Sequence, residues 1–326
     1  MTKEATLDLK DRRILDAIEM KGRFFTSDIA KRVGLSKEVV AYRLSVLEKK
    51  GIITGYHAII NLTQLAKTPY LLAINLMDVT KEDTDAILAF LQQEEEVVLV
   101  QEADVLWDLL FHIVVKDNMS FLQFLDRFNK RFKKFIEKSQ VSIILEEEYL
   151  SRRYILGKDK PEKDQLHSLS WQTQKSDSCD ATDAAIIRAL VSDAQTPLLT
   201  LAKQLKLDSM TIKRRIDRLE KEEIIIGYMT SLNLKSLGIT TFCVRLTLSD
   251  TERLRAMTEY VRHLPETVHF KRDIGGYDFS FDIDVPSQTR FEEIIVELRR
   301  QFPVVREVEH FTILRTHKNQ LHAVLS

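Results

Sequence analysis

Two stretches of the chain place basic and polar side chains where they could contact nucleic acid. KEVVAYR at 37–43 and SMTIKRR at 209–215 each follow a good helix N-cap residue, Ser36 in the first and Asp208 in the second. In a helix-turn-helix, outward residues at the start of the second helix meet base edges, and basic side chains along it and nearby meet phosphates. The residues predicted to face bases are Lys37, Glu38, Ala41, Tyr42, Ser209, Met210, Lys213 and Arg214. Those predicted to meet phosphates are Arg43, Lys49, Lys50, Arg215, Arg218 and Lys221.

Other chemistry has little support in the sequence. The eight histidines lack the spacing of metal ligands, and the chain has neither a phosphate-cradling glycine loop nor a GxSxG motif. Cys179 and Cys243 lie too far apart for a CxxC pair. We therefore expect no metal, no cofactor and no enzymatic activity. Because the formal net charge is −1, a surface for nucleic acid must be a local patch.

The chain repeats itself. LEKKGIITGY at 47–56 returns as LEKEEIIIGY at 219–228, and the same offset carries Asp8 onto Asp180, Asp11 onto Asp183 and Arg43 onto Arg215. It also carries YLLAINL at 70–76 onto FCVRLTL at 242–248. The chain is therefore predicted to be a tandem duplication. Its predicted divisions are a first helix-turn-helix domain (1–62), a first sheet domain (63–156), a linker (157–179), a second helix-turn-helix domain (180–234) and a second sheet domain (235–326).

Each copy opens with apolar residues at helical spacing, which predicts three short helices. Gly34 supplies a turn before the third helix of the first copy, where the second copy has Lys206. The β-branched stretch that follows, IITGY or IIIGY, predicts a short strand. A winged helix-turn-helix is the simplest interpretation.

The second part of each copy predicts a ferredoxin-like βαββαβ domain. In the first copy the strands are expected at 70–76, 97–102, 109–115 and 141–149, with helices near 81–93 and 119–136. Phenylalanines at helical spacing in the second helix, from Phe121 to Phe135, are interpreted as core. The fold class is therefore α+β, written twice. The polar linker contains Trp171, the one residue there with a side chain suited to docking.

The motif D-x-x-D-x-x-I-(I/L), then R-(L/I)-x-x-L-E-x-x-x-I-I-x-G-Y, followed by a βαββαβ domain, resembles the Lrp/AsnC family of transcriptional regulators. The resemblance covers nearly the whole chain, twice. It implies binding to double-stranded DNA through the first domain of each copy. It also implies that the second, called the RAM domain, mediates self-association and binds an amino acid or related effector.

The family's effector loop is retained unevenly. The second copy keeps it as Gly275, Gly276, Tyr277 and Asp278, where paired glycines would leave backbone amides open to a carboxylate and Asp278 could meet an ammonium group. The alternative is a turn that the aspartate caps. The first copy has Val105, Leu106, Trp107 and Asp108 instead, so its RAM-like domain is expected to be structural.

Fusing two copies makes the second DNA contact intramolecular. Because Ala41 and Tyr42 correspond to Lys213 and Arg214, we expect a pseudo-dimer that reads an asymmetric or imperfectly palindromic site. The chain has no long apolar run and no signal-peptide pattern, so a cytoplasmic location without membrane contact is expected.

Two rival hypotheses remain open. Siroheme decarboxylases resemble the same architecture, and the chain offers His269, Lys271, Arg272 and His310 for such chemistry. However, the second and fourth strands of a βαββαβ sheet lie at opposite edges, so His269 and His310 should not converge. The other alternative is an adaptor that has lost DNA binding, to which the nearly neutral charge of the second helix-turn-helix would be suited.

Overall fold

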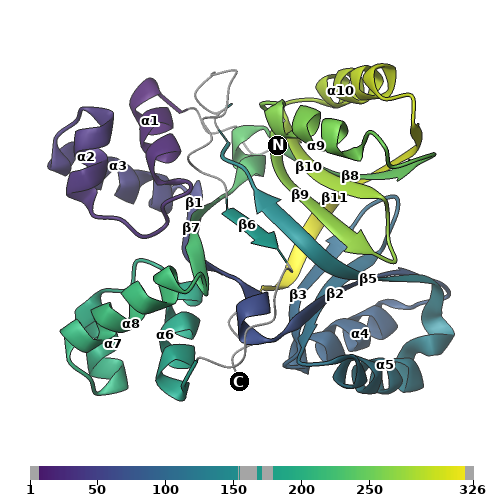
Figure 1. Cartoon of the computed structure of the whole chain (residues 1–326), viewed down its shortest axis with the longest axis horizontal. Helices are drawn as coiled ribbons and strands as arrows, with labels where there is room; N and C mark the ends of the chain where they lie inside the picture. Colours follow the sequence, from purple (N-terminus) through teal and green to yellow (C-terminus); the bar gives the residue numbers. More distant parts are fainter. Residues whose placement is uncertain (1–6, 153, 155–166, 171–178, 320–326) are drawn as a thin grey trace.

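The computed structural model describes residues 7–152, 154, 167–170 and 179–319. Two three-helix units lie on one side of the molecule, and the strand-rich region with its four covering helices lies on the other (Figure 1). No helix among these residues is both long and apolar enough to span a bilayer.

The two three-helix units are the predicted helix-turn-helix domains. Their helices are α1 (Leu9–Ile18), α2 (Thr26–Val33) and α3 (Lys37–Lys49) in the first copy, and α6 (Ala181–Ser192), α7 (Leu198–Leu205) and α8 (Ser209–Lys221) in the second. Ser36 caps α3 by accepting a hydrogen bond from the Val39 amide, and Asp208 caps α8 in the same way. The predicted caps are therefore confirmed.

The turn before the third helix is left-handed in both copies. Gly34 has φ 68°, and Lys206 adopts φ 56° at the equivalent position. A non-glycine residue pays a steric cost there, because its Cβ crowds the backbone. The second copy thus keeps the turn geometry without the glycine.

The strand predicted after each recognition helix is present, and its partner comes from the other copy. β1 (Ile53–Ile60) and β7 (Ile225–Leu232) pair antiparallel as a separate two-stranded sheet, with Ala58 opposite Tyr228. The two helix-turn-helix units are therefore joined by a ribbon, which we call the β1–β7 ribbon.

The remaining long strands form the two βαββαβ domains. The first contains β2 (Thr68–Leu76), α4 (Lys81–Gln93), β3 (Val97–Ala103), β4 (Leu109–Val115), α5 (Asn118–Phe132) and β5 (Ile136–Tyr149). The second contains β8 (Thr240–Leu248), α9 (Leu254–His263), β9 (Thr267–Ile274), β10 (Phe279–Val285), α10 (Gln288–Gln301) and β11 (Val305–Asn319). The predicted order is confirmed in both. Short 3-10 turns follow β1 (Leu62–Leu65), α5 (Lys133–Phe135) and β7 (Leu234–Leu237).

The two domains share one sheet. Its strand order is β2-β4-β3-β11-β8-β10-β9-β5-β6, and β5 pairs with β2 as well. The last strand of each domain crosses over: β5 pairs first with β2 and then with β9, and β11 pairs first with β8 and then with β3. The strands from β2 round to β5 therefore close into a barrel.

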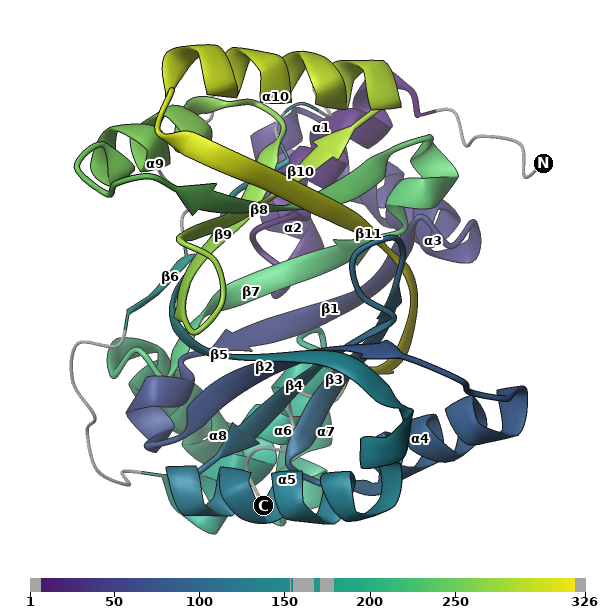
Figure 2. The ribbon, with the colours of Figure 1, turned by 90° about the vertical axis from the view of Figure 1, so that its right-hand side faces the viewer.

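The helices cover the outside of this barrel. α4 and α5 lie on the face of the first copy and α9 and α10 on the face of the second, with the strands between them (Figure 2). The phenylalanines of α5 fill the layer beneath, since Phe121, Phe124, Phe128 and Phe132 are buried. Their interpretation as core is confirmed.

The predicted linker contains a strand that the sequence pattern did not indicate. β6 (His167–Ser170) pairs antiparallel with the end of β5, so part of 157–179 extends the sheet. Backbone pairing along the free edge of β5 accounts for this, because an edge strand offers hydrogen bonds to any extended segment. Trp171 lies outside the described residues.

Candidate functional site

The recognition helices expose most of the residues predicted to meet bases. Lys37, Glu38, Ala41 and Tyr42 are all exposed on α3, with Tyr42 at 71%. On α8 the exposed members of the set are Met210, Lys213 and Arg214, whereas Ser209 is half-buried. Among the phosphate candidates, Lys49, Lys50 and Lys221 are exposed.

Three of the predicted phosphate contacts are bound inside their own domain. In the first copy, Nη1 of Arg43 lies 2.7 Å from a carboxylate oxygen of Asp8 and 2.7 Å from one of Asp11. These aspartates also form the capping box of α1. The repeated aspartates and arginine thus tie the first helix to the recognition helix, and contact of Arg43 with phosphate stays a prediction.

The second copy repeats this arrangement with one more arginine. Arg215 Nη1 lies 2.7 Å from Asp180 and 2.8 Å from Asp183, and Arg218 also pairs with Asp183. The side chain of Asp183 is fully buried, and its ion pairs with the two arginines offset the loss of its hydration. Arg215 and Arg218 therefore hold the first helix of this unit against the recognition helix, and their contact with phosphate stays a prediction.

The basic cluster of α8 is left with two exposed cations. Lys213 Nζ lies 2.5 Å from Asp217 one turn along, but both side chains are more than half exposed, so water screens the pair. No ion pair joins Arg214 to any described residue. Lys213 and Arg214 together keep positive charge on the outer face of the helix.

Direct contacts fix the spacing between the two helix-turn-helix units. Arg23 Nη1 donates to the carbonyl oxygens of Ala194 and Thr196 at 2.5 and 3.0 Å, and Gln195 Nε2 donates to the Gly22 carbonyl at 2.9 Å. These bonds add to the β1–β7 ribbon. Since a dimeric reader needs a defined distance between its recognition helices, this rigid connection suits two adjacent half-sites.

The predicted effector loop lies against the first copy. Gly275 has φ 92°, and a Cβ there would lie 2.6 Å from the Val141 carbonyl oxygen. Asp278 accepts a hydrogen bond from the Leu248 amide at 2.7 Å, and Asp108 makes the matching bond to the Leu76 amide at 2.6 Å in the copy without the glycines.

The shared bond supports the alternative of a turn-capping aspartate. Tyr277 is half-buried, and its hydroxyl is hydrogen-bonded to Glu309 and Trp107, so it too has partners within the protein. An effector at Gly275, Gly276, Tyr277 and Asp278 stays a prediction.

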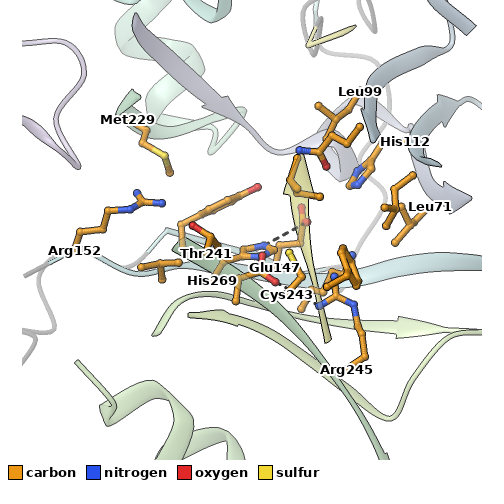
Figure 3. A pocket seen from close by; sticks show the side chains of 18 residues that line it. Leu71, Leu99, His112, Glu147, Arg152, Met229, Thr241, Cys243, Arg245 and His269 are labelled. Atoms are coloured by element: carbon orange, nitrogen blue, oxygen red, sulfur yellow. Dashed lines mark hydrogen bonds and ion pairs between the residues drawn. The ribbon is translucent and has the colours of Figure 1, made fainter. Parts of the chain in front are cut away.

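A second candidate site lies inside the barrel, and we call it the central cavity. It encloses about 290 Å³ between the inner faces of the two βαββαβ domains. Leu71, Leu99 and His112 line it from the first copy, and Cys243, Arg245 and His269 line it from the second (Figure 3). Arg152 and Met229 border it on the side of the helix-turn-helix units.

His269 sits between two carboxylates in this cavity. Its Nδ1 lies 3.1 Å from Asp282 Oδ2, and its Nε2 lies 3.5 Å from Glu147 Oε1. Burial alone would lower the pKa of His269, but the two carboxylates outweigh burial and raise the pKa to about 9. The same contact holds the pKa of Asp282 below its usual range despite burial. His269 is therefore a cation at neutral pH.

Two further basic groups have no such partners. Lys271 is 4% exposed, and its ammonium makes no hydrogen bond or ion pair with any described residue. Burial and the nearby Arg245 lower the pKa of Lys271. His112, on the opposite wall, likewise has no hydrogen bond to a described residue, and burial together with the charge of Lys271 lowers its pKa to about 4. His112 is neutral at pH 7.

The histidine argument made from the sequence is confirmed for one pair and incomplete for another. His310 packs against Phe291 of α10, on the helix-covered face, whereas His269 lines the cavity on the inner face. These two histidines do not converge. His112 of the first copy and His269 of the second do line the same cavity, because the strand exchange brings the two inner faces together.

Arg152 connects the central cavity to the first helix-turn-helix. Its Nε donates to Asp284 of β10 at 2.7 Å, and its Nη1 donates to Glu19, at the end of α1, at 3.1 Å. Burial raises the pKa of Glu19 to about 7, against the opposing charge of Arg152. Tyr154 also donates to Asp284, at 2.9 Å. This buried network spans the two kinds of domain.

The cavity residues could have been found by comparing the copies. Arg245, Lys271 and Asp282 stand at inward strand positions where the first copy has Ala73, Gln101 and His112, so the second copy has Arg, Lys and Asp where the first has none of these. A charge at an inward position of a strand is unusual enough to mark a site.

Comparisons with known proteins support the assignment of the two helix-turn-helix units. Residues 7–54 match a family model described as winged helix-turn-helix DNA-binding, and residues 180–220 match one described as AsnC-type helix-turn-helix domain. The proline dehydrogenase transcriptional activator of Rhizobium radiobacter is 26% identical over 150 residues, which span 45% of this chain and 96% of that protein. Nearly all of that regulator thus matches less than half of this chain.

A second curated regulator and a solved structure also match this chain. The leucine-responsive regulatory protein of Haemophilus influenzae is 34% identical over 95 residues, 27% of this chain and 57% of that protein. A solved structure titled siroheme decarboxylase NirDL in co-complex with an iron-uroporphyrin III analogue matches with a TM-score of 0.64 and 13% identity, over 97% of this chain and 95% of that one. That likeness concerns the fold alone. The curated relatives are transcriptional regulators of the Lrp/AsnC type.

Proposed function

We propose that this chain is a sequence-specific DNA-binding transcriptional regulator of the Lrp/AsnC type, acting in the cytoplasm as an intramolecular pseudo-dimer. One observation carries the proposal: the β1–β7 ribbon fixes two capped recognition helices on the same side of the molecule, each with exposed polar and basic residues. Two helices at a fixed separation are what a protein needs to read two half-sites of a duplex.

The base contacts we propose differ between the copies. α3 would present Lys37, Glu38, Ala41 and Tyr42, and α8 would present Met210, Lys213 and Arg214. Lys49, Lys50 and Lys221 would meet phosphates, where each contact makes binding more salt-dependent. Because the two sets differ in charge and size, the proposed site has two unlike halves.

We also propose that a small effector regulates DNA binding and that chains associate further through their RAM-like domains. The effector proposal is supported by the connection between the barrel and the first helix-turn-helix through Arg152 and Glu19. A ligand can shift DNA affinity only if it binds two arrangements of the domains differently, and such a network offers the contact through which they would differ.

A second candidate function is decarboxylation of a tetrapyrrole, favoured by the NirDL fold and by histidines and a lysine in one cavity. At about 290 Å³ the central cavity lies at the lower end of the range for small-molecule sites, which favours a ligand smaller than a macrocycle. Titration with iron uroporphyrin III separates the two functions. A regulator leaves the absorption spectrum of the porphyrin unchanged, whereas a change that saturates at one equivalent supports the enzyme.

The direct test of the main proposal is selection of bound fragments from sheared genomic DNA at two salt concentrations. A regulator enriches a defined site, and its affinity falls steeply with salt. Absence of both enrichment and salt dependence would favour the adaptor instead.

A further inference from the structure

The two inner faces of the barrel differ in charge at equivalent positions. In the first copy these positions hold Leu71, Ala73, Leu99, Gln101, Leu110 and His112, and in the second they hold Cys243, Arg245, His269, Lys271, Ser280 and Asp282. The pairing register confirms the equivalence, since Leu99 lies opposite His112 and His269 lies opposite Asp282. One wall of the central cavity is therefore mainly apolar and the other is charged.

The charged wall carries more positive than negative charge. Among the residues that line the cavity, the cations are Arg245, His269 and Lys271, and the carboxylates are those of Glu147 and Asp282, with Arg245 Nη1 3.4 Å from Asp282 Oδ1. Asp273, which lies outside this lining, also opposes the charges of Lys271 and Arg245. Arg152, at the border, is already neutralised by Asp284 and Glu19. Within the lining itself, three cations therefore face two carboxylates.

Lys271 is the lining lysine, and it forms no ion pair with the part of the chain that the structure describes. Its side chain is almost fully buried, yet no carboxylate lies within ion-pair distance of its ammonium among the described residues. Burying an unpaired charge costs several kcal/mol, so such a residue is retained where another group supplies the partner. A cavity beside it provides room for that group.

We propose that the central cavity binds a small organic monocarboxylate with an apolar side group, of the class of branched or aromatic 2-oxo acids. The carboxylate would pair with Lys271 and Arg245, and the apolar group would lie against Leu71, Leu99 and Leu110 on the opposite wall. This inference rests on the proposed function, because it names the effector class and places the effector site away from the Gly275–Asp278 loop.

The charge balance selects an anion over a zwitterion. An amino acid has no net charge at neutral pH, and its ammonium would need a free carboxylate in the cavity. Glu147 and Asp282 both already face the charged ring of His269. A 2-oxo acid has the same side chain without the ammonium, so it matches the excess of one cation among the lining residues.

Occupancy of the cavity would reach the DNA-binding units through two residues at its border. Met229 belongs to β7 and lines both the central cavity and a neighbouring cavity of about 300 Å³ beneath the β1–β7 ribbon. Arg152 is bonded to the end of α1 through Glu19. A ligand that displaces Met229 would shift β7, which follows recognition helix α8 in the chain. A ligand that displaces Arg152 would shift α1, which is joined to recognition helix α3 by the ion pair of Asp11 with Arg43.

The test is calorimetric titration of the full chain with 4-methyl-2-oxopentanoate and with leucine, which share a side chain, and with phenylpyruvate. We expect saturable binding of at least one 2-oxo acid, with leucine at least tenfold weaker. Lys271→Gln introduces the residue type that the first copy has at the equivalent position, Gln101. It should weaken binding of the 2-oxo acid about tenfold or more, since a hydrogen-bonded charge pair is lost. Arg272→Gln removes a charge from the exposed face of the same strand and should leave affinity unchanged.

A second variant tests the location without touching charge. Cys243→Leu also introduces the residue of the first copy and fills part of the cavity, so it should abolish binding. Leucine binding as well as its 2-oxo acid, unchanged binding by Lys271→Gln, or no binding of either 2-oxo acid at millimolar concentration would each overturn the inference. DNA affinity of the unliganded chain is measured on the same samples, so the inference can fail while the proposed function stands, or the reverse.

Discussion

Lys271 in β9 and Gln101 in β3 occupy equivalent positions of the two copies, and both side chains line the central cavity. Lys271 lies opposite Ser280 and Gln101 lies opposite Leu110, so the pairing registers agree. Equivalent backbone positions thus hold a neutral amide on one wall and, on the other, a buried ammonium that makes no ion pair with a described residue.

Replacing that ammonium should make the protein more stable. Lys271→Met keeps the length of the side chain and removes a charge whose burial outweighs the nearby carboxylates and lowers its pKa, so we expect the unfolding temperature to rise in the absence of ligand. Differential scanning calorimetry measures the shift, with Arg272→Met as the control on the exposed face. A lower unfolding temperature for Lys271→Met than for the control would show that the ammonium has a stabilising partner.

Two neighbouring arginines of α8 should separate folding from DNA contact. Arg215→Ala removes one of the two cations at the buried carboxylate of Asp183 and should lower the free energy of unfolding by about 2 kcal/mol. Arg214→Ala should leave stability within about 0.5 kcal/mol, because the side chain is exposed and makes no ion pair with the described residues.

The loss of DNA affinity should be larger for Arg214→Ala than for Arg215→Ala, opposite to the order of their effects on stability. Arg214→Ala should weaken DNA binding and reduce its salt dependence, as expected for a contact to the duplex. Urea unfolding and DNA titration at several salt concentrations measure both quantities. Equal losses of stability in the two variants would contradict the assignment of Arg215 as a structural residue.

The two recognition helices should read different sequences. Selection of bound DNA from a random pool should return a site with unlike halves, because α3 exposes Tyr42 where α8 exposes Arg214. Tyr42→Ala should relax base preference in one half only, and Arg214→Ala in the other. A perfect palindrome would refute this expectation.

Glu19 should make stability depend on pH. Its pKa is raised from 4.5 to about 7 in the folded protein, so between these values the folded state binds more protons than the unfolded state. The contribution of Glu19 to stability therefore falls as pH rises from about 5 to about 7, and it is constant above that range. The full change is roughly 3 kcal/mol for a shift of this size.

Glu19→Gln removes the titrating group and gives the comparison. As pH rises from about 5 to about 7, the unfolding free energy of the natural protein should fall relative to that of Glu19→Gln. Urea titrations at several pH values measure it. A constant difference would mean that Glu19 stays ionised beside Arg152 throughout.

Much of the fold could be predicted because it is encoded locally and written twice. The caps Ser36 and Asp208 and the apolar spacing of each helix act within a few residues, so the sequence displays them directly. The pairing of β1 with β7 and the exchange of β5 and β11 between domains have no local signature. Long-range pairings depend on which edges meet in three dimensions.

The residues of the candidate sites also divide into those that local sequence predicts and those that depend on long-range contacts. Lys37, Tyr42 and Arg214 were predicted to be exposed from helical geometry alone, and they are. Arg43 and Arg215 were assigned to phosphate because their charge suggested it, whereas their partners lie a helix away. The central cavity could not be predicted until the two inner faces were known to meet.

The exchanged strand β11 also limits the order in which the shared sheet can form during synthesis. It is the last described element of the chain, and it alone fills the gap between β3 of the first copy and β8 of the second. While the chain is being synthesised, both of those edges stay open for pairing with any extended segment nearby. The sheet of the first copy therefore cannot be completed until β11, at the end of the second copy, has been synthesised.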